Sequence, residues 1–209
     1  KEQIRCSWAN PKNLLYIRYH DEEWGVPVHD DHKLFEMLML ESFQAGLSWE
    51  CILNKREAFR QAFDNFDVEK ICRYDEEKLT ALGQDSGIVR NKLKIRAAVN
   101  NARIFRAIQH EWGSFERYLW HWTEGEIIYE TGRVSSELSD VVSEDLKRRG
   151  MKFVGTVIIY SYLQAVGVIN SHEETAFAGN QREQNFDRTI SRRSYKTEQQ
   201  HHPPGDPGG

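Results

Sequence analysis

A glutamate inside an apolar helix is the first candidate for a functional group. The segment 34–49, LFEMLMLESFQAGLSW, has helical spacing, and at about 100° per residue Leu34, Leu38 and Glu41 fall on one face. The residues expected to point away from that face are Glu36, Phe43 and Gln44. A buried carboxylate without a partner is costly, so Glu41 is expected to meet a cation, hydrogen-bond donors or a ligand.

Aromatic side chains accompany this glutamate along the sequence. A base flipped out of a duplex is held by stacking between aromatic faces and by hydrogen bonds to its edge. The candidates for such a purine pocket are Trp8, Tyr16, Tyr19 and Trp49. The alternative is an aromatic core around one satisfied acid, and the residue types alone leave both interpretations open.

A second candidate is the turn DSGIVRNK, residues 85–92, between two helical segments. Backbone N–H groups of such a turn and the following helix N-terminus can bind a phosphate, with Arg90 and Lys92 adding charge. Gly87 is expected to adopt a positive φ and to allow close approach of the backbone. The alternative is a simple hairpin of two helices.

The formal net charge of -4 gives no general support for nucleic-acid binding, but two basic clusters could supply a local face. The first contains Arg90, Lys92, Lys94 and Arg96, and the second contains Lys147, Arg148, Arg149 and Lys152. Solvated helix ends are the alternative interpretation of both.

A cysteine and two histidines, Cys6, His20 and His172, have side chains that suit Zn²⁺. Structural zinc almost always takes four ligands, and the residues alone offer only these three. Cys51 and Cys72 are expected to be small core residues.

The rest of the chain predicts an all-α protein. With 209 residues, 39% of them hydrophobic, the chain can bury one substantial core or two small helical lobes. No apolar run is long enough to span a membrane, the first residues do not resemble a signal peptide, and three cysteines favour a reducing compartment. A cytoplasmic protein without a membrane segment is therefore expected.

Helical periodicity and capping residues predict the order of the elements. Helices are expected at 31–45, 50–63, 68–74, 76–84, 94–112, 114–122, from a cap at Ser139 or Asp140 to Gly150, and at 155–168. Residues 123–134 are expected to be irregular or briefly extended. The last of these helices is almost entirely apolar and is expected to be buried. Composition divides the chain into a globular domain, 1–176, and a disordered tail, 177–209.

Together these motifs resemble the 3-methyladenine DNA glycosylase I family of the helix-hairpin-helix superfamily. The matching segments are RCSWAN, YIRYHDEEWGVPVHDDHKLFEMLMLESFQAGLSW, FDVEKICRYDEEKLTAL, QDSGIVRNKLKIRAAVNNAR and KRRGMKFVGTVIIYSYLQAVGVINSH. The resemblance implies a helix-hairpin-helix glycosylase fold of two helical lobes with the base pocket between them. It also implies a DNA repair enzyme that flips 3-methyladenine out of alkylated double-stranded DNA and hydrolyses its N-glycosidic bond, leaving an abasic site.

The resemblance also implies roles for single residues. Glu41 is the catalytic candidate: it hydrogen-bonds the extruded base and complements its charge, and a general-base role stays open. Tyr19 and Trp49 stack on the base, and Tyr16 and Trp8 complete the pocket. Leu47, which follows Gly46 after the helix, fills the gap left in the duplex. The hairpin residues Gly87, Ile88, Arg90 and Lys92 hold the phosphates.

The family's zinc site is incomplete in this chain. Cys6, His20 and His172 match three of its ligands, but the fourth position is Ala176. The zinc is therefore absent, weakly bound, or completed by water or by a nearby carboxylate such as Glu173 or Glu174. Two other functions are weighed against the glycosylase, which is expected to act as a monomer. These are a non-catalytic helix-hairpin-helix DNA-binding protein and a helical protein that binds a small purine.

Overall fold

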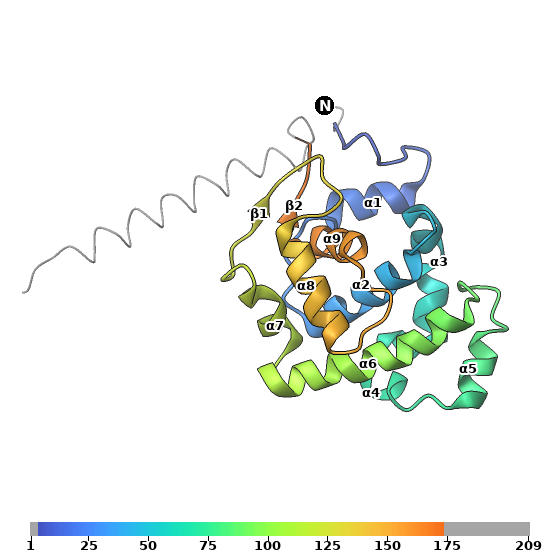
Figure 1. The fold of residues 1–209 in the computed structure, drawn as a ribbon. Helices are drawn as coiled ribbons and strands as arrows, with labels where there is room; N and C mark the ends of the chain where they lie inside the picture. Colours follow the sequence, from blue (N-terminus) through green and yellow to red (C-terminus); the bar gives the residue numbers. More distant parts are fainter. Residues whose placement is uncertain (1–3, 174–209) are drawn as a thin grey trace, which may run out of the picture. The chain divides into compact units, whose positions relative to one another are not determined.

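A computed structural model describes residues 4–173 of the chain (Figure 1). These residues belong to two compact units, one formed by Ala9–Ser171 and the other by Lys1–Trp8 together with His172–Gly209. The expected tail, 177–209, and Ala176 lie outside the described residues.

The large unit is built from helices, which confirms the all-α prediction. Its helices are α1 (Leu14–Glu22), α2 (Asp31–Gln44), α3 (Trp49–Ala62), the 3₁₀ turn η1 (Asp64–Phe66), α4 (Val68–Ile71), α5 (Glu76–Leu82), α6 (Lys92–Trp112), α7 (Phe115–His121), α8 (Glu137–Arg148) and α9 (Thr156–Ala165). The two strands, β1 (Ile128–Tyr129) and β2 (Ile169–Asn170), form one short parallel pair with Ile128 opposite Ile169.

Helix α2 is the centre of the large unit. Asp30 caps it by accepting a hydrogen bond from the Lys33 N–H at 2.9 Å, as its sequence predicts. The helix packs against α3, α6, α7 and α9, and every residue from Leu34 to Phe43 is buried. Glu36 and Phe43, which were expected to point away from the face of Glu41, are buried as well, because a helix with neighbours on all sides has no solvent-facing side.

The capping residues fix most of the other helix boundaries. Asp67 and Asp75 cap α4 and α5 as predicted, and Gly150 adopts the expected left-handed conformation after α8, with φ of 99°. The predicted cap of α8 is wrong, since Ser136 caps the helix, which begins at Glu137. Ser139 occupies the third helical position, where its Oγ accepts a hydrogen bond from the Ser136 N–H at 2.8 Å, forming a capping box.

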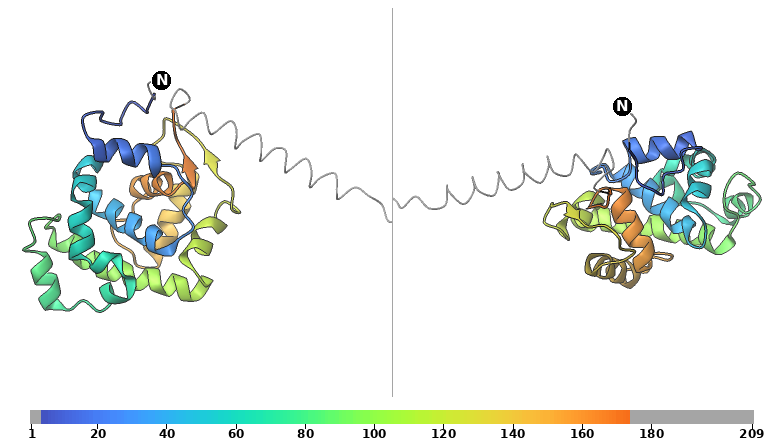
Figure 2. Two further views of the ribbon diagram at one scale, coloured as in Figure 1. Left: turned by 180° about the vertical axis from the view of Figure 1, so that it is seen from behind. Right: turned by 90° about the horizontal axis from the view of Figure 1, so that it is seen from above.

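Helix α6 is the longest helix of the described residues and organises one side of the large unit. Asn91 caps it through hydrogen bonds from the N–H groups of Leu93 and Lys94. Helices α4, α5 and α7 pack against it, and both Figure 1 and Figure 2 show α4 and α5 beside it. Helix α9 packs on α2 and α8, and its burial confirms the prediction from its apolar sequence.

Helix α1 was not predicted from the sequence. Asn13 starts this helix by accepting hydrogen bonds from the N–H groups of Leu15 and Tyr16. None of the helices within residues 4–173 is long and apolar enough to cross a membrane.

In the small unit, the two segments of the chain are joined by hydrogen bonds. The Ser7 N–H and hydroxyl donate to the Glu173 carboxylate, the hydroxyl at 2.7 Å, and the Glu173 N–H donates to Cys6 Sγ at 3.4 Å. The Glu173 carboxylate, one of the expected substitutes for the fourth zinc ligand, is thus engaged by Ser7.

Candidate functional site

Three helices of the large unit, α1, α2 and α3, carry the aromatic and acidic candidates. The Asn13 amide at the start of α1 donates to Glu50 Oε1 at 2.8 Å and to Asn54 Oδ1 at 3.0 Å, both on α3. These bonds hold the first turn of α1, which contains Tyr16, beside the first turn of α3, which contains Trp49.

Glu41 is buried on α2 with only 3% of its surface exposed, which agrees with the prediction that it faces inward. Burial raises the pKa of its carboxyl group to about 8. Within residues 4–173, no group hydrogen-bonds to its Oε2 atom. An acid with this pKa is mostly protonated at neutral pH, and its unused oxygen is available to a ligand.

Tyr16, Tyr19 and Trp49 lie around this acid, and we call these four residues the Glu41 cluster. The Tyr19 and Trp49 rings are 5.3 Å apart between centroids at an interplanar angle of 48°. Burial raises the pKa of both tyrosines, and the nearby charge of Glu41 raises each further. The structure therefore brings together four of the five predicted base-pocket residues. Trp8 belongs to the small unit, and its role stays a prediction.

Leu47 lies in a tight turn that directly follows α2. Ala45, with φ of -48° and ψ of 116°, and Gly46, with φ of +79°, occupy the middle of this turn, and the Leu47 N–H donates to Gln44 O at 2.7 Å. The Gln44 amide closes it a second time by donating to Leu47 O at 2.8 Å. The turn presents the Leu47 side chain with 39% of its surface exposed.

The hairpin between α5 and α6 is a turn at residues 86–88. The expected positive φ of Gly87 is wrong, since Gly87 is not among the residues with that conformation. Glycine is required there for space, because an added Cβ would lie 3.0 Å from both Ala58 Cβ and Asp85 Oδ1. The Gly87 N–H already donates to Asp85 Oδ1 at 2.8 Å.

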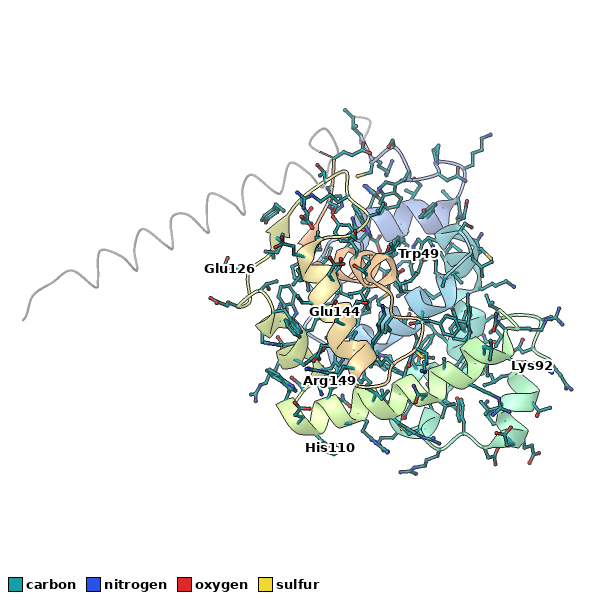
Figure 3. The ribbon with its side chains drawn as sticks, viewed as in Figure 1. Trp49, Lys92, His110, Glu126, Glu144 and Arg149 are labelled. Atoms are coloured by element: carbon teal, nitrogen blue, oxygen red, sulfur yellow. The ribbon has the colours of Figure 1, made fainter. Side chains whose placement is uncertain are left out.

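Other groups of the hairpin remain available to a phosphate. Within residues 4–173, no hydrogen bond occupies the N–H groups of Val89 and Arg90, which follow the turn. Lys55 on α3, which sequence reasoning missed, donates to the carbonyls of Ser86 and Gly87 at 3.4 Å and brings a third cation beside Arg90 and Lys92. Figure 3 shows Lys92 at the end of α6 that adjoins the hairpin.

The basic clusters are smaller than their sequences suggest. Lys94 is buried, and the exposed Arg96 is paired with Glu76 by two hydrogen bonds of 2.7 Å. Arg90 and Lys92 are the exposed cations of the first cluster that form no ion pair within residues 4–173. In the second cluster, Arg149 hydrogen-bonds to Asp145 and Glu111. Figure 3 labels this arginine near the end of α8.

The three zinc candidates fall in different units. Cys6 and His172 belong to the small unit and His20 to the large one. His20 Nδ1 lies 2.9 Å from Asp21 Oδ1, a pairing with a carboxylate that commonly orients metal-binding histidines. Among the described residues, no group of three or more histidine, cysteine or acidic side chains could hold a metal ion.

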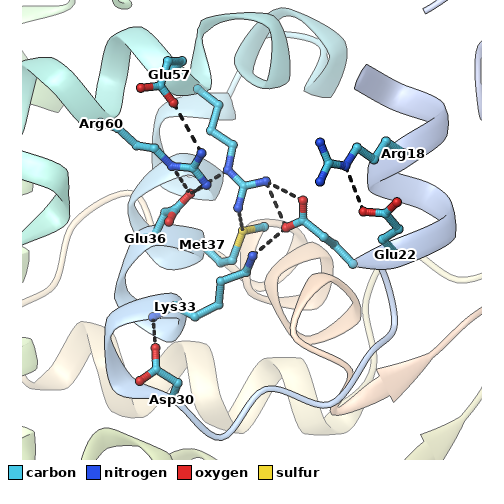
Figure 4. A network of polar contacts seen from close by, with 10 residues as sticks. Arg18, Glu22, Asp30, Lys33, Glu36, Met37, Glu57 and Arg60 are labelled. Carbon is cyan, nitrogen blue, oxygen red and sulfur yellow. Dashed lines mark hydrogen bonds and ion pairs between the residues drawn. The ribbon is translucent and has the colours of Figure 1, made fainter. Parts of the chain in front are cut away.

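A network of ion pairs that sequence reasoning missed connects the same three helices (Figure 4). Arg56 on α3 joins Glu36 on α2 to Glu23, which follows α1, and Lys33 pairs with Glu23 at 2.6 Å. Arg60 adds a second contact to Glu36 at 2.8 Å. The only sequence signal was Glu36 itself, a second acid within an apolar helix.

Comparison with solved structures defines the class of the fold. A crystal structure of 3-methyladenine DNA glycosylase I matches with a TM-score of 0.80 and 42% identity, covering 83% of this chain and 98% of that one. The structure of the Staphylococcus aureus 3-methyladenine DNA glycosylase I, solved to explain 3-methyladenine recognition, matches with a TM-score of 0.80 and 33% identity over 84% of this chain and 96% of that one. The fold is that of the all-α DNA glycosylases.

Sequence comparison narrows this class to one family. DNA-3-methyladenine glycosylase 1 of Escherichia coli is 43% identical over 174 residues, which are 80% of this chain and 92% of that protein. The methyladenine glycosylase family model matches residues 8–179. The chain belongs to the methyladenine glycosylase family.

Proposed function

We propose that this chain is a DNA repair enzyme that releases 3-methyladenine from alkylated duplex DNA by hydrolysing the N-glycosidic bond. The observation that carries the proposal is the state of Glu41: a buried acid with an unused oxygen, set among Tyr16, Tyr19 and Trp49. The relatives that share its fold and most of its length are named for this activity.

The chemistry of the lesion explains how little acid assistance the site must supply. Methylation at N3 makes the base cationic, so when its bond to the sugar breaks, the bonding electrons neutralise the leaving base. Water supplies the oxygen that the sugar carbon gains, and an abasic site remains. Positioning of the extruded base can then provide much of the rate increase. Consistent with this, α6 carries no acid before Glu111.

Glu41 matches the charge of this substrate. Its pKa of about 8 means that the carboxyl group holds a proton in the empty site at neutral pH. A cationic base stabilises the ionised carboxylate of Glu41. Neutral adenine does not, so the cost of ionising the buried carboxyl group remains. We therefore assign Glu41 to recognition of the base and of its positive charge, with Tyr19 and Trp49 offering aromatic faces beside it.

The Leu47 turn and the hairpin are the proposed DNA contacts. Leu47 is exposed at the end of a turn that Gly46 allows, a geometry suited to filling the space that an extruded nucleotide leaves. The N–H groups around Val89 and Arg90, with Lys92, suit a phosphate. Binding through such contacts should weaken steeply as the salt concentration rises, which a binder of free purines would not show.

The test is release of free bases from methylated duplex DNA, separated by chromatography, for the wild-type protein and for Glu41→Ala. We expect the wild type to release 3-methyladenine and the variant to release at least about a hundredfold less, as for loss of a group that contacts the reacting base. A folded wild type that binds duplex DNA but releases no base would instead support the non-catalytic DNA-binding protein.

Zinc binding is a separate proposal. We propose that this chain retains little or no Zn²⁺ at Cys6, His20 and His172, because structural zinc takes four ligands and the fourth family position is Ala176. The finding that no group of three such side chains within residues 4–173 could hold a metal ion supports this proposal. The contact of His20 with Asp21 supports a ligand role for this histidine. Metal analysis after dialysis against a chelator should find little zinc in the wild type and about one ion per chain in Ala176→Cys. Full retention in the wild type would contradict the proposal.

We also propose that the protein works as a monomer in the cytoplasm. Within residues 4–173, Cys6, Cys51 and Cys72 form no disulfide, which supports a reducing compartment. Light scattering of the purified chain tests the oligomeric state, and fractionation of the source cells tests the location.

A further inference from the structure

Lys94 is a buried lysine that has no role in the proposed function. It lies in the first turn of α6 with 7% of its surface exposed. Burial of an ammonium group is costly unless its protons are hydrogen-bonded. Its Nζ atom donates to Phe43 O at 2.8 Å and to Ala45 O at 2.5 Å, and it lies 5.9 Å from the centre of the Phe153 ring. Two carbonyl oxygens therefore accept hydrogen bonds from this amine, although burial lowers its pKa.

The two carbonyl groups belong to the end of α2. Carbonyls in the last turn of a helix lack partners within the helix, and a cation there is stabilised by the helix dipole. The Ala45 carbonyl also belongs to the central peptide of the turn that presents Leu47. Lys94 thus holds the turn two residues before the leucine.

The backbone of Lys94 is fixed to the hairpin. Asn91, three residues earlier, caps α6 by accepting hydrogen bonds from the N–H groups of Leu93 at 3.0 Å and Lys94 at 3.1 Å. The N–H groups of Val89 and Arg90 that suit a phosphate directly precede this cap. One side chain therefore spans from the hairpin to the Leu47 turn.

The same helix holds the aromatic neighbour of Lys94. Asn101, two turns further along α6, accepts a hydrogen bond from the Lys152 N–H at 2.9 Å and donates to Lys152 O at 2.8 Å. These bonds fix the chain directly before Phe153, which has a positive φ of 56°. Such a backbone conformation is unfavourable for phenylalanine and persists only where its surroundings enforce it.

We propose that Lys94 is a positioning residue that couples the phosphate-binding hairpin to the Leu47 turn. Attachment of the hairpin to the DNA backbone then determines where Leu47 enters the duplex. Lys94 contacts neither the base nor the sugar in this role and acts through Leu47. The inference rests on the proposed glycosylase function and adds the link between its two DNA contacts.

A double-mutant cycle tests this link through base release from methylated duplex DNA. The four proteins are the wild type, Lys94→Met, Leu47→Ala and the double variant. We expect Lys94→Met, which keeps the apolar stem and loses the donors, to slow release about tenfold or more. In the Leu47→Ala background the same change should have almost no further effect, because the residue through which Lys94 acts is gone.

Binding of free 3-methyladenine distinguishes positioning from general damage to the fold. Lys94→Met should bind the free base as the wild type does, since the Glu41 cluster is untouched. Lys94→Arg, which keeps the charge and the donors, should recover part of the lost rate. Lys70→Met, at an exposed lysine on α4, is the matched control and should leave the rate unchanged.

Additive losses in the cycle would overturn the proposal, and so would loss of free-base binding in Lys94→Met. If that variant does not fold, the cycle is repeated with Lys94→Gln, which keeps an amide donor and carries no charge. A wild type that binds DNA without releasing base would show that the proposed function has failed, and the cycle is then measured on duplex affinity.

Discussion

Arg56 and Glu36 form a buried ion pair between α3 and α2, in which Arg56 Nε donates to Glu36 Oε1 at 2.6 Å. The same guanidinium donates from Nη1 to both carboxylate oxygens of Glu23, at 2.9 and 3.0 Å (Figure 4). Glu23 follows α1, so one arginine joins the three helices that carry the Glu41 cluster. The charge of Arg56 also acts on the buried Tyr19.

Replacing Arg56 by methionine should lower the free energy of unfolding by about 3 kcal/mol, because the buried Glu36 carboxylate loses its shortest ion pair and keeps only Arg60. Urea unfolding measures this loss. Arg18→Met is the matched control, since Arg18 forms an exposed pair with Glu22 within α1, and its replacement should leave the free energy of unfolding unchanged. Equal losses of unfolding free energy in the two variants would show that the buried ion pairs stabilise the fold no more than an exposed pair does.

The raised pKa of Glu41 predicts how stability changes with pH. The folded chain holds this proton up to about pH 8, whereas the ordinary value is 4.5. The folded state therefore binds more protons than the unfolded state between these values, and the free energy of unfolding falls as the pH rises through this window. The contribution of Glu41 is least favourable above pH 8.

Glu41→Gln removes this titration and should reverse the loss. We expect the variant to be more stable than the wild type at pH 9, by up to a few kcal/mol, and to differ little from it near pH 4.5. Thermal unfolding across this range checks the difference, with Glu57→Gln at an exposed position of α3 as the control. A constant difference at all pH values would contradict the raised pKa.

Gly87→Val should weaken binding of duplex DNA about tenfold or more, because a side chain at this position meets Ala58 and Asp85 at 3.0 Å and must displace the hairpin. Fluorescence anisotropy with a labelled duplex measures the affinity. Binding of free 3-methyladenine should persist in this variant. An unchanged duplex affinity would remove the hairpin from the DNA-binding surface.

Alanine substitutions at two glycines with nearly the same φ distinguish the effect of backbone strain from an effect on base release. Gly46 has φ of +79° and Gly125 has φ of +80°, and an added Cβ would meet no atom within 4 Å at either position. Alanine at each should therefore cost about 1 kcal/mol of stability through backbone strain alone. Only Gly46→Ala should also slow base release, since it alters the turn that presents Leu47. Equal rates in the two variants would contradict the role of that turn.

The sequence predicted those features that depend on neighbours along the chain. Asp30, Asp67 and Asp75 begin helices because a side-chain oxygen can reach an N–H group two or three residues later. Glu41 was expected to face inward from helical periodicity, and its burial confirms this.

Features that depend on the surroundings of a helix were not predictable. Glu36 was expected to point away from the face of Glu41, and its burial was not predicted, because periodicity assumes one buried face whereas α2 is covered on all sides. Lys94 was assigned to an exposed basic cluster. Nothing in its own segment indicates that its amine donates hydrogen bonds to the carbonyls of residues 43 and 45. The cap of α8 was predicted at the wrong residue because Ser136 and Ser139 are equally good local candidates. The hydrogen bonds between these two serines make Ser136 the cap.

The unused oxygen of Glu41 also bears on how the reaction ends. Cleavage turns a cationic nucleobase into a neutral product, so the carboxylate loses its counter-charge while it is still buried. Its affinity for a proton then returns to that of the empty site, and the attraction that held the lesion is gone. Under the role proposed for Glu41, neutralisation of the base by cleavage therefore favours release of the product.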